Sequence, residues 1–256
     1  MLKRIITALA IIAVVIPPLM FGGILNYLLV ALIVLVGGME LSSILPGYHK
    51  VNKLLYIVPL IFAYALYFVD VEVAVALLTL IVLSLLSIPV FVEKYNSEDA
   101  LMSAAIVILF YVIGKAYLAI YDLGLMYLMF ILIATFATDT GAYFTGYFFG
   151  KRKLCERISP KKTIEGSIGG VAFSWVLATL FIVFVFKEAN LMLVLLTGLV
   201  MPFTSQIGDL AFSALKRLYN IKDFSNILPG HGGFMDRLDS LVFNLAVFYA
   251  FMVVIL

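Results

Sequence analysis

Long apolar stretches, separated by short polar ones, occupy almost the whole chain. A helix needs about 20 apolar residues to cross the hydrocarbon core of a bilayer. Stretches that meet or approach this length cover residues 5–21, 24–45, 54–69, 71–92, 100–121, 125–149, 168–186, 191–207 and 238–256. The pattern predicts an all-α, polytopic membrane protein with about nine transmembrane helices. The first and third stretches are short enough for a re-entrant or tilted segment.

The composition supports a membrane location. Hydrophobic residues make up 64% of the 256 positions and charged residues 12%, whereas about a quarter of the residues in soluble domains are charged. The chain is therefore an integral membrane protein. Its one cysteine, Cys155, excludes an internal disulfide. The basic start and first apolar stretch are similar to a signal peptide but lack a small-residue cleavage site, so we expect a retained first helix.

The 17 lysines and arginines indicate the orientation. Most of them gather in alternate connections, as expected when those connections face the cytoplasm. This places the N-terminus in the cytoplasm and, with an odd number of spans, the C-terminus outside. Lys115 and Lys187 fall toward the other side. The default location is a bacterial inner (plasma) membrane.

Two cytoplasmic connections, residues 150–170 and 213–237, are long and rich in lysine, glycine, serine and proline. Such loops are where binding and catalytic residues concentrate. We therefore divide the chain into two regions. Residues 1–122 form N-terminal helices that face lipid or a second copy of the chain, and residues 123–256 hold both loops and the candidate chemistry.

Carboxylates near the apolar stretches are the first candidates for chemistry, because they are expensive there unless paired or functional. Asp139 lies near the cytoplasmic end of the sixth stretch, on a helical face of small residues. Close packing of another helix is the alternative interpretation of that face. Asp209 lies at the cytoplasmic end of the eighth stretch, just after residue 207, and Ser213 and Lys216 follow on the same helical face. A plain membrane boundary would also explain Lys216 and Arg217.

The stretch PGHGGFMDRLDS, residues 229–240, precedes the last apolar stretch. Its proline and glycines delay the last helix and free backbone N–H groups for a ligand, and a helix N-terminus attracts phosphate. Asp236 and Asp239 are spaced i, i+3, so both project from one side of the first turns. The helix macrodipole explains one such acid, but not a second one with Arg237 between them. His231 is a candidate for orienting a phosphate or a carboxylate.

The loop at residues 150–170 carries a dense run of lysines and arginines. Attraction to anionic lipid headgroups accounts for such a run. It does not account for SPKKT, residues 159–163, followed by Glu165 and a glycine, because an acid suits a lipid-binding patch poorly.

Together these acids, lysines and glycines indicate phosphoryl-type chemistry on the cytoplasmic face. Carboxylate oxygens without a cysteine or histidine cluster favour Mg²⁺ over zinc. Carboxylates with Mg²⁺ would neutralise phosphate oxygens, while lysine and arginine would stabilise developing charge. The inferred substrates are a polyphosphate and a molecule of the membrane, with no nucleic-acid partner.

The segment from Ser213 to Asp239, SALKRLYNIKDFSNILPGHGGFMDRLD, resembles the signature of the membrane-bound phosphatidate cytidylyltransferases (CDP-diacylglycerol synthases). DTGAY at Asp139 and SPKKTIEG from Ser159 are similar to the same family. The resemblance implies that CTP and phosphatidic acid react to give CDP-diacylglycerol and pyrophosphate in phospholipid biosynthesis. It also implies a requirement for Mg²⁺, with a second cation left open.

The resemblance further implies roles for individual residues. The metal would be held or oriented by Asp209, Asp236 and Asp239. The other catalytic positions would be Lys216, Arg217, Lys222, Asp223, His231 and Arg237. Substrate binding would involve Asp139, Ser159, Lys161, Lys162, Thr163, Glu165, Ser213, Gly232 and Gly233. Because the attacking phosphate is already ionised near neutral pH, no strong general base is needed, and His231 is interpreted as a positioning group.

Alternatives remain open at this point. The first is a CTP-dependent transferase that acts on another lipid phosphate or an isoprenoid. A different class is a membrane transporter that uses Asp139, Asp209 and Lys115 as buried charges, and a third is a non-catalytic membrane scaffold. A homodimer is also left open.

Overall fold

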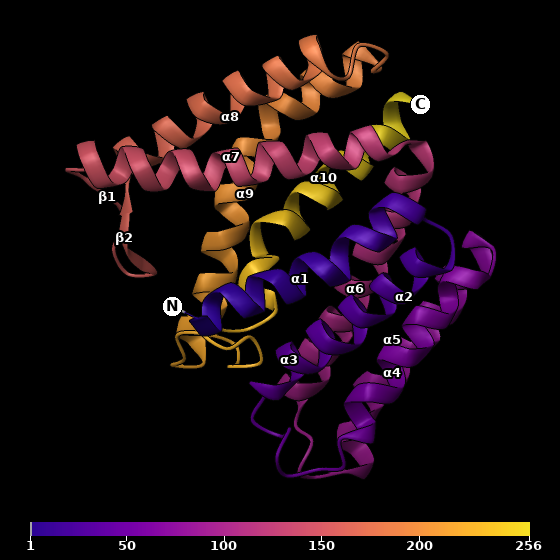
Figure 1. Ribbon diagram of the computed structural model, residues 1–256. Helices are drawn as coiled ribbons and strands as arrows, with labels where there is room; N and C mark the ends of the chain where they lie inside the picture. The colour runs from indigo at the N-terminus through magenta and orange to yellow at the C-terminus, as the bar shows by residue number, and fades with distance from the viewer. Residues whose placement is uncertain (1) are drawn as a thin grey trace. The chain divides into compact units, whose positions relative to one another are not determined.

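The computed structural model describes residues 2–256, with side chains described from residue 6 onward. In chain order the elements are α1 (Leu2–Phe21), α2 (Ile24–Leu32), the π-helical turn η1 (Ile33–Gly37), α3 (Gly38–Ser43), α4 (Leu54–Ala65), the 3-10 turn η2 (Leu66–Phe68), α5 (Val71–Phe91), α6 (Ser97–Leu123), α7 (Leu125–Phe149), β1 (Lys153–Cys155), β2 (Ser159–Thr163), α8 (Ile164–Phe184), α9 (Leu191–Leu218), the 3-10 turn η3 (Met235–Arg237) and α10 (Asp239–Ile255). Figure 1 shows these elements along the chain.

Six helical segments within residues 2–256 are long and apolar enough to cross a membrane. They are Ile24–Ser43, Val71–Phe91, Ser97–Leu123, Leu125–Phe149, Ile164–Phe184 and Leu191–Leu218. Shorter apolar helices cover Ile6–Phe21, Leu54–Phe68 and Asp239–Ile255. The all-α, polytopic membrane architecture is therefore confirmed. Nine crossings and a cytoplasmic N-terminus stay predictions, and Met1 lies outside the described residues.

Within the described residues, the two strands of the structure form a small β-hairpin. Strands β1 and β2 pair antiparallel within the lysine-rich loop, with Lys153 opposite Thr163 and Cys155 opposite Ser159. Side chains alternate across a strand, so Lys161 is exposed while Lys162, its neighbour on β2, is half-buried. The hairpin therefore gives these two lysines different surroundings.

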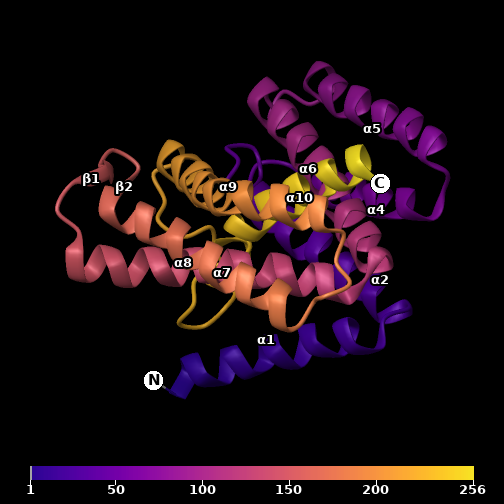
Figure 2. The same ribbon diagram turned by 90° about the horizontal axis from the view of Figure 1, so that it is seen from above.

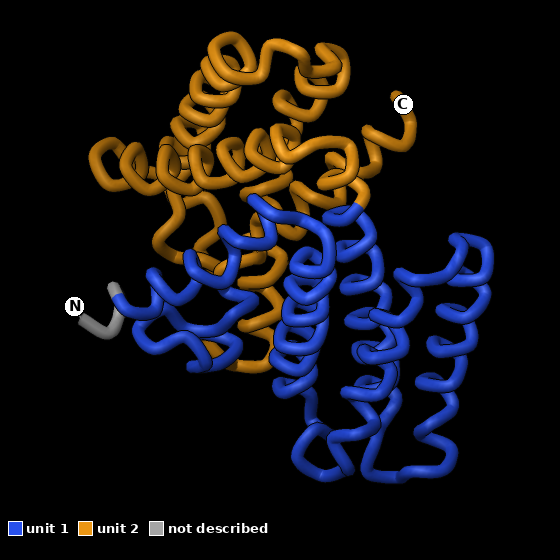
Figure 3. The backbone as a smooth tube through the Cα atoms, turned by 45° about the vertical axis from the view of Figure 1, so that its right-hand side comes forward, with its two compact units in different colours: residues 1–118, 223–236 blue, residues 119–222, 237–256 orange. Residues whose placement is uncertain are grey.

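The described chain packs as two compact units, which Figure 3 colours separately. The first contains the described residues up to Leu118 together with Asp223–Asp236. The second contains Ala119–Lys222 and Arg237–Leu256. The predicted division between residues 122 and 123 stays a prediction.

The first unit holds its helices together with buried polar contacts as well as apolar packing. Asp99 is fully buried and accepts hydrogen bonds from the backbone N–H groups of Gly47 (2.9 Å) and Asn96 (3.1 Å). The hydroxyl of Tyr67 donates to the carbonyl oxygen of Phe110 (2.6 Å). Each bond satisfies a group that would otherwise be desolvated without a partner.

In the second unit α7 and α8 lie side by side, as Figures 1 and 2 both show. A Cβ added at Gly170 on α8 would lie 2.7 Å from the carbonyl oxygen of Thr138, and one added at Gly166 would lie 2.8 Å from that of Ala142. Glycine therefore permits direct contact between the two helix backbones, as in membrane helix pairs generally. The small-residue face predicted around Asp139 packs against α8.

A polar side chain inside α10 ties three helices of this unit together. Asn244, which interrupts the last apolar stretch, is fully buried. Its Nδ2 donates to Thr135 Oγ1 on α7 (2.8 Å), and its Oδ1 accepts from Thr204 Oγ1 on α9 (2.6 Å). These bonds fix how α7, α9 and α10 are aligned with one another along their lengths.

Candidate functional site

Helices α9 and α10 come into close backbone contact at Gly208, which lies on α9. A Cβ added at Gly208 would lie 2.8 Å from the carbonyl oxygen of Asp239 and 2.9 Å from the ring of Phe243. The next residue on α9 is Asp209, and Asp239 is the first residue of α10. The absence of a side chain at Gly208 thus brings two acidic positions, far apart in the sequence, to the same place.

Three carboxylates of the second unit interact there. Asp209 is an electrostatic neighbour of both Asp139 on α7 and Asp239 on α10. Asp139 is exposed, whereas Asp209 and Asp239 are half-buried. Ser240 Oγ donates to Asp139 Oδ1 (3.5 Å), and its backbone N–H donates to Asp239 Oδ1 (2.8 Å). Ser240 therefore connects two of the three acids.

Two lysines offset part of this negative charge. Lys162 Nζ lies 2.5 Å from Asp209 Oδ2, in an ion pair whose side chains are 27% and 30% exposed. Lys162 also interacts electrostatically with Asp139 and Asp239, and the buried Lys216 interacts with Asp239. Ser213 Oγ donates to Asp209 Oδ1 (3.2 Å). The "carboxylate cluster" is this set: Asp139, Lys162, Asp209, Ser213, Lys216, Asp239 and Ser240.

The donor set of the cluster suits a hard cation. Among the described residues, no group of three or more histidine, cysteine, aspartate or glutamate side chains is arranged to hold a metal ion. Mg²⁺, however, is usually held by one or two carboxylates together with substrate phosphates and water. The oxygens of Asp209 and Asp239 fit a site of that kind, which a phosphate substrate would complete.

In the first unit, the glycine-rich segment Asp223–Asp236 forms a tight loop, which we call the signature loop. Gly230 and Gly232 have φ angles of 79° and 86°, which glycine adopts readily. The N–H of Gly232 donates to the carbonyl oxygen of Leu228 (3.1 Å). Asp236 Oδ2 accepts the N–H groups of Phe224 (3.0 Å) and Gly233 (2.9 Å). One oxygen of Asp236 thus holds the two ends of the loop together. The N–H of Gly233, which the sequence suggested would face a ligand, donates within the loop.

A second acid, Glu40 on α3, also contacts the signature loop. It is 2% exposed. Its Oε1 accepts from Phe234 N (2.9 Å) and from the hydroxyl of Ser225, and its Oε2 accepts from Met235 N (2.5 Å). Both units therefore carry acids at the ends of apolar helices.

The β-hairpin is anchored by residues from the same lysine-rich loop. Glu165 Oε2 accepts the N–H groups of Lys151 (3.0 Å) and Arg152 (3.1 Å), and Glu165 Oε1 forms an ion pair with Arg152 Nε (3.4 Å). Thr163 Oγ1 accepts the N–H of Gly166 (3.1 Å) and so caps α8. These contacts hold strand β2 at the start of α8, and Lys162 on that strand lies beside Asp209.

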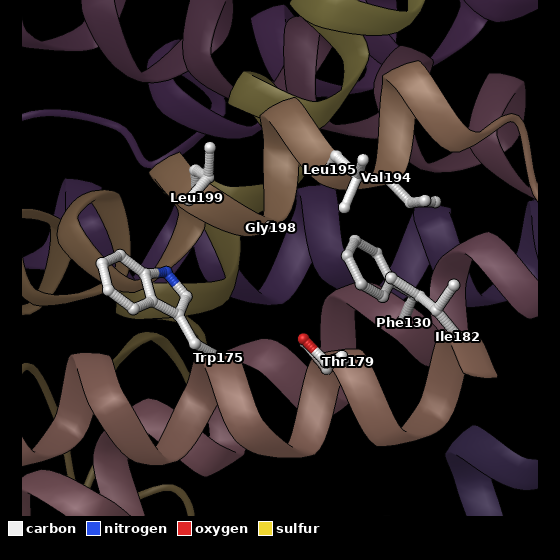
Figure 4. A pocket seen from close by; sticks show the side chains of 9 residues that line it. Phe130, Trp175, Thr179, Ile182, Val194, Leu195, Gly198 and Leu199 are labelled. Carbon is white, nitrogen blue, oxygen red and sulfur yellow. The ribbon is translucent and has the colours of Figure 1, made fainter. Parts of the chain in front are cut away.

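An apolar groove lies between α7, α8 and α9 of the second unit. Its volume is about 240 Å³, and its walls include Phe130, Trp175, Thr179 and Gly198. Figure 4 shows Trp175 and Thr179 on α8 across from Gly198 on α9. Gly198 and Asp209 are eleven residues apart on α9, which is about three helical turns, or roughly 16 Å. The groove and the carboxylate cluster therefore share one face of this helix.

A family model described as the cytidylyltransferase family matches residues 2–255. The chain belongs to the cytidylyltransferase family. It is 33% identical over 252 residues to the phosphatidate cytidylyltransferase of Staphylococcus epidermidis, covering 94% of this chain and 95% of that protein. It is also similar to the phosphatidate cytidylyltransferase of Bacillus subtilis (strain 168), with 46% identity over 126 residues. That second alignment spans about half of each protein, 49% of this chain and 47% of the relative.

These comparisons confirm the family resemblance that the sequence suggested, and the structure places the predicted site residues in three surroundings. The carboxylate cluster brings together Asp139, Lys162, Asp209, Ser213, Lys216 and Asp239. The signature loop holds Asp223, His231, Gly232, Gly233 and Asp236. Elsewhere in the second unit lie Ser159, Lys161, Thr163, Glu165, Arg217, Lys222 and Arg237.

Several of the predicted residues make contacts that shape the backbone. Arg217 donates from Nη1 to the carbonyl oxygen of Ile221 (2.8 Å) and from Nε to that of Ile158 (3.3 Å). It therefore links the end of α9 to the hairpin. Asp236, Thr163 and Glu165 likewise accept backbone N–H groups.

Sequence reasoning missed three residues of these sites. Glu40 is an acid near the end of the apolar stretch at residues 24–45, and an ionisable residue in such a stretch is by itself a reason to suspect function. Gly208 directly precedes Asp209, but no pattern in the sequence showed which helix it faces. Ser240 follows Asp239, and its contact with Asp139 depends on the packing of α7 against α10.

Proposed function

We propose that this cytidylyltransferase family member transfers the cytidylyl group of CTP to phosphatidic acid, giving CDP-diacylglycerol and pyrophosphate in phospholipid biosynthesis. The observation that carries the proposal is the close approach of Asp209 and Asp239, from α9 and α10, beside Lys162 at the ends of apolar helices. Such a place suits a reaction between a water-soluble nucleotide and a lipid headgroup. We place it on the cytoplasmic side of a bacterial plasma membrane, where CTP is available.

The reaction needs little proton chemistry from the protein. An oxygen of the phosphatidic acid phosphate attacks the α-phosphorus of CTP, and the bond from that phosphorus to the bridging oxygen of the β-phosphate breaks. Pyrophosphate leaves with the electron pair of that bond. Because the attacking phosphate is already ionised near neutral pH, no strong general base is required. Catalysis then depends on alignment and on neutralising charge.

The residues of the carboxylate cluster divide these tasks. Lys162 and Lys216 would stabilise the negative charge that develops on the phosphate oxygens. Asp209 and Asp239 would hold a Mg²⁺ ion, or a pair of cations, because their oxygens match its ligand preference. When bound, Mg²⁺ neutralises phosphate oxygens and orients the substrates. Ser213 and Ser240 keep the carboxylates in position through their hydrogen bonds.

The apolar groove provides a place for the hydrocarbon part of the lipid. It lies on the same face of α9 as Asp209, about 16 Å away along the helix. A headgroup at the cluster would therefore direct an acyl chain of phosphatidic acid toward the groove. Replacing Gly198 by leucine would fill it, and turnover of long-chain phosphatidic acid should fall relative to a short-chain, soluble analogue.

The test of the function is pyrophosphate release from CTP by the purified protein in detergent. It is measured with and without phosphatidic acid and Mg²⁺, beside Asp239→Asn, and with a panel of other lipid phosphates and isoprenoid substrates. We expect release that needs all three components and falls at least about 10²-fold in the variant, as for loss of one charge-stabilising group. Turnover of a non-glycerol lipid alone, or no release by folded protein, would refute the proposal.

A further inference from the structure

Glu40 is a buried acid whose compensation comes from a single loop. Burying a carboxylate is unfavourable unless it is paired or hydrogen-bonded. Within the described residues, no lysine or arginine forms an ion pair with Glu40. Its donors are instead the hydroxyl of Ser225 and the N–H groups of Phe234 and Met235, all from the signature loop.

These donors come from opposite ends of the loop. Ser225 stands near its start, and Phe234 and Met235 stand near its end. Asp236 joins the same two ends, because its Oδ2 accepts the N–H groups of Phe224 and Gly233. Two carboxylates therefore close the loop, one from inside it and one from α3. A shift of the loop by one residue would break both sets of bonds.

The close approach of Glu40 to the loop also explains why residue 233 is a glycine. A Cβ added at Gly233 would collide with Glu40 Oε1 and would lie 2.8 Å from Asp236 Oδ2. Gly233 is thus needed so that both carboxylates can reach the loop backbone. Its N–H donates to Asp236, so the glycine serves the folding of the loop itself.

We propose that Glu40 is a positioning residue for the transfer reaction, which holds the signature loop in its working conformation through Ser225, Phe234 and Met235. The inference rests on the proposed function. The loop carries Asp223 and His231, and the chain runs from Met235 through η3 directly to Asp239 at the start of α10. Asp239 follows Met235 by four positions in the sequence, so the covalent chain transmits a displacement of the loop backbone to the start of α10. Glu40 acts through the loop and need not touch a substrate.

The test compares Glu40→Gln with a matched control, Asp99→Asn. Glutamine keeps the size of the side chain but places an amide NH₂ against backbone donors. Asp99 is a fully buried acid of the same unit that accepts two backbone N–H groups, those of Gly47 and Asn96, neither of which belongs to the signature loop. Two properties are measured in each variant: hydrogen exchange of the backbone amides in the signature loop, residues 223–236, and kcat and KM for CTP.

In Glu40→Gln we expect faster exchange in the signature loop and a fall in kcat of about 10- to 100-fold, the size expected when reacting groups are misplaced by up to about 1 Å. KM for CTP should change by less than about threefold, because misplacement lowers kcat more than ground-state binding. Asp99→Asn should leave both the loop exchange and kcat near those of the wild type.

Unchanged exchange in the loop of Glu40→Gln would overturn the proposal, as would an equal loss of kcat in the control. If Glu40→Gln does not fold, Ser225→Ala removes one donor and leaves Glu40 in place, and the same loop-specific change in exchange is expected. The exchange measurement needs no substrate. Absence of turnover by the wild type would therefore count against the proposed function, while the exchange result would still decide the role of Glu40.

Discussion

Replacing Gly208 by alanine tests whether the contact between α9 and α10 sets the geometry of the carboxylate cluster. The new Cβ would lie 2.8 Å from the carbonyl oxygen of Asp239 and 2.9 Å from the ring of Phe243. Optimal separations between such atoms are about 3.5–4.0 Å. Because one of these neighbours is backbone, rotation of a side chain cannot relieve the clash, and the helices must separate by roughly 0.5–1 Å.

Two effects follow from that separation. Overpacking of this kind destabilises a protein by about 1–3 kcal/mol. A displacement of Asp239 relative to Asp209 approaching 1 Å lowers the rate by up to about 10²-fold. We therefore expect Gly208→Ala to remain folded, with a modest fall in melting temperature, and to lose roughly 10- to 100-fold in kcat for pyrophosphate release.

Gly198→Ala is the matched control, because it makes the same substitution on the same helix. Its Cβ would lie 3.3 Å from the ring of Phe130, which borders the apolar groove, so a shift of a few tenths of an ångström accommodates it. Kcat should stay within about threefold of the wild type with a short-chain lipid, since no group of the cluster is displaced. Full activity in Gly208→Ala, or an equal loss in Gly198→Ala, would show that the close approach at Gly208 does not position the acids.

Three further predictions concern the cluster and its support. Lys162→Met should lower kcat by about 10²-fold through loss of charge stabilisation, whereas Lys161→Met, at the exposed neighbouring position, should keep kcat within about threefold of the wild type. Both variants are compared by steady-state kinetics at fixed ionic strength, and equal losses of kcat would indicate a general effect of loop charge. Asn244→Leu removes hydrogen bonds to Thr135 and Thr204 and should lower the free energy of unfolding by about 1–3 kcal/mol; an unchanged thermal midpoint in detergent would contradict this role. Chelation of divalent cations should abolish pyrophosphate release, and added Mg²⁺ should restore it; activity that persists under chelation would exclude the proposed metal site.

The sequence predicted where the helices lie better than it predicted which helices contact one another. A hydrocarbon core must be crossed by apolar segments of a certain length, so the positions of the nine stretches could be found without coordinates. The i, i+4 spacing of Asp209 and Ser213 likewise predicted a shared face, and the structure confirms it with a direct hydrogen bond. Spacing on one helix is a local property, and the chain geometry fixes it.

Contacts between distant segments could not be found in this way. Nothing in the sequence indicates that Lys162 pairs with Asp209 and that Lys161 does not, because that choice depends on the hairpin and on the packing of α8 against α9. Glu40 and Gly233 are 193 positions apart in the sequence, yet a Cβ at Gly233 would collide with the carboxylate of Glu40.

By itself, the sequence determined that the chain resides in the membrane, where its helices lie, and to which family its polar segments are related. These properties depend on local composition and on residue order. Only the tertiary structure decided that Asp139, Asp209 and Asp239 share one cluster, while Asp236 serves to fold a loop. The reason is physical: electrostatic and hydrogen-bond energies depend on distances across the fold, and those distances are set by the packing of glycine-containing helix faces.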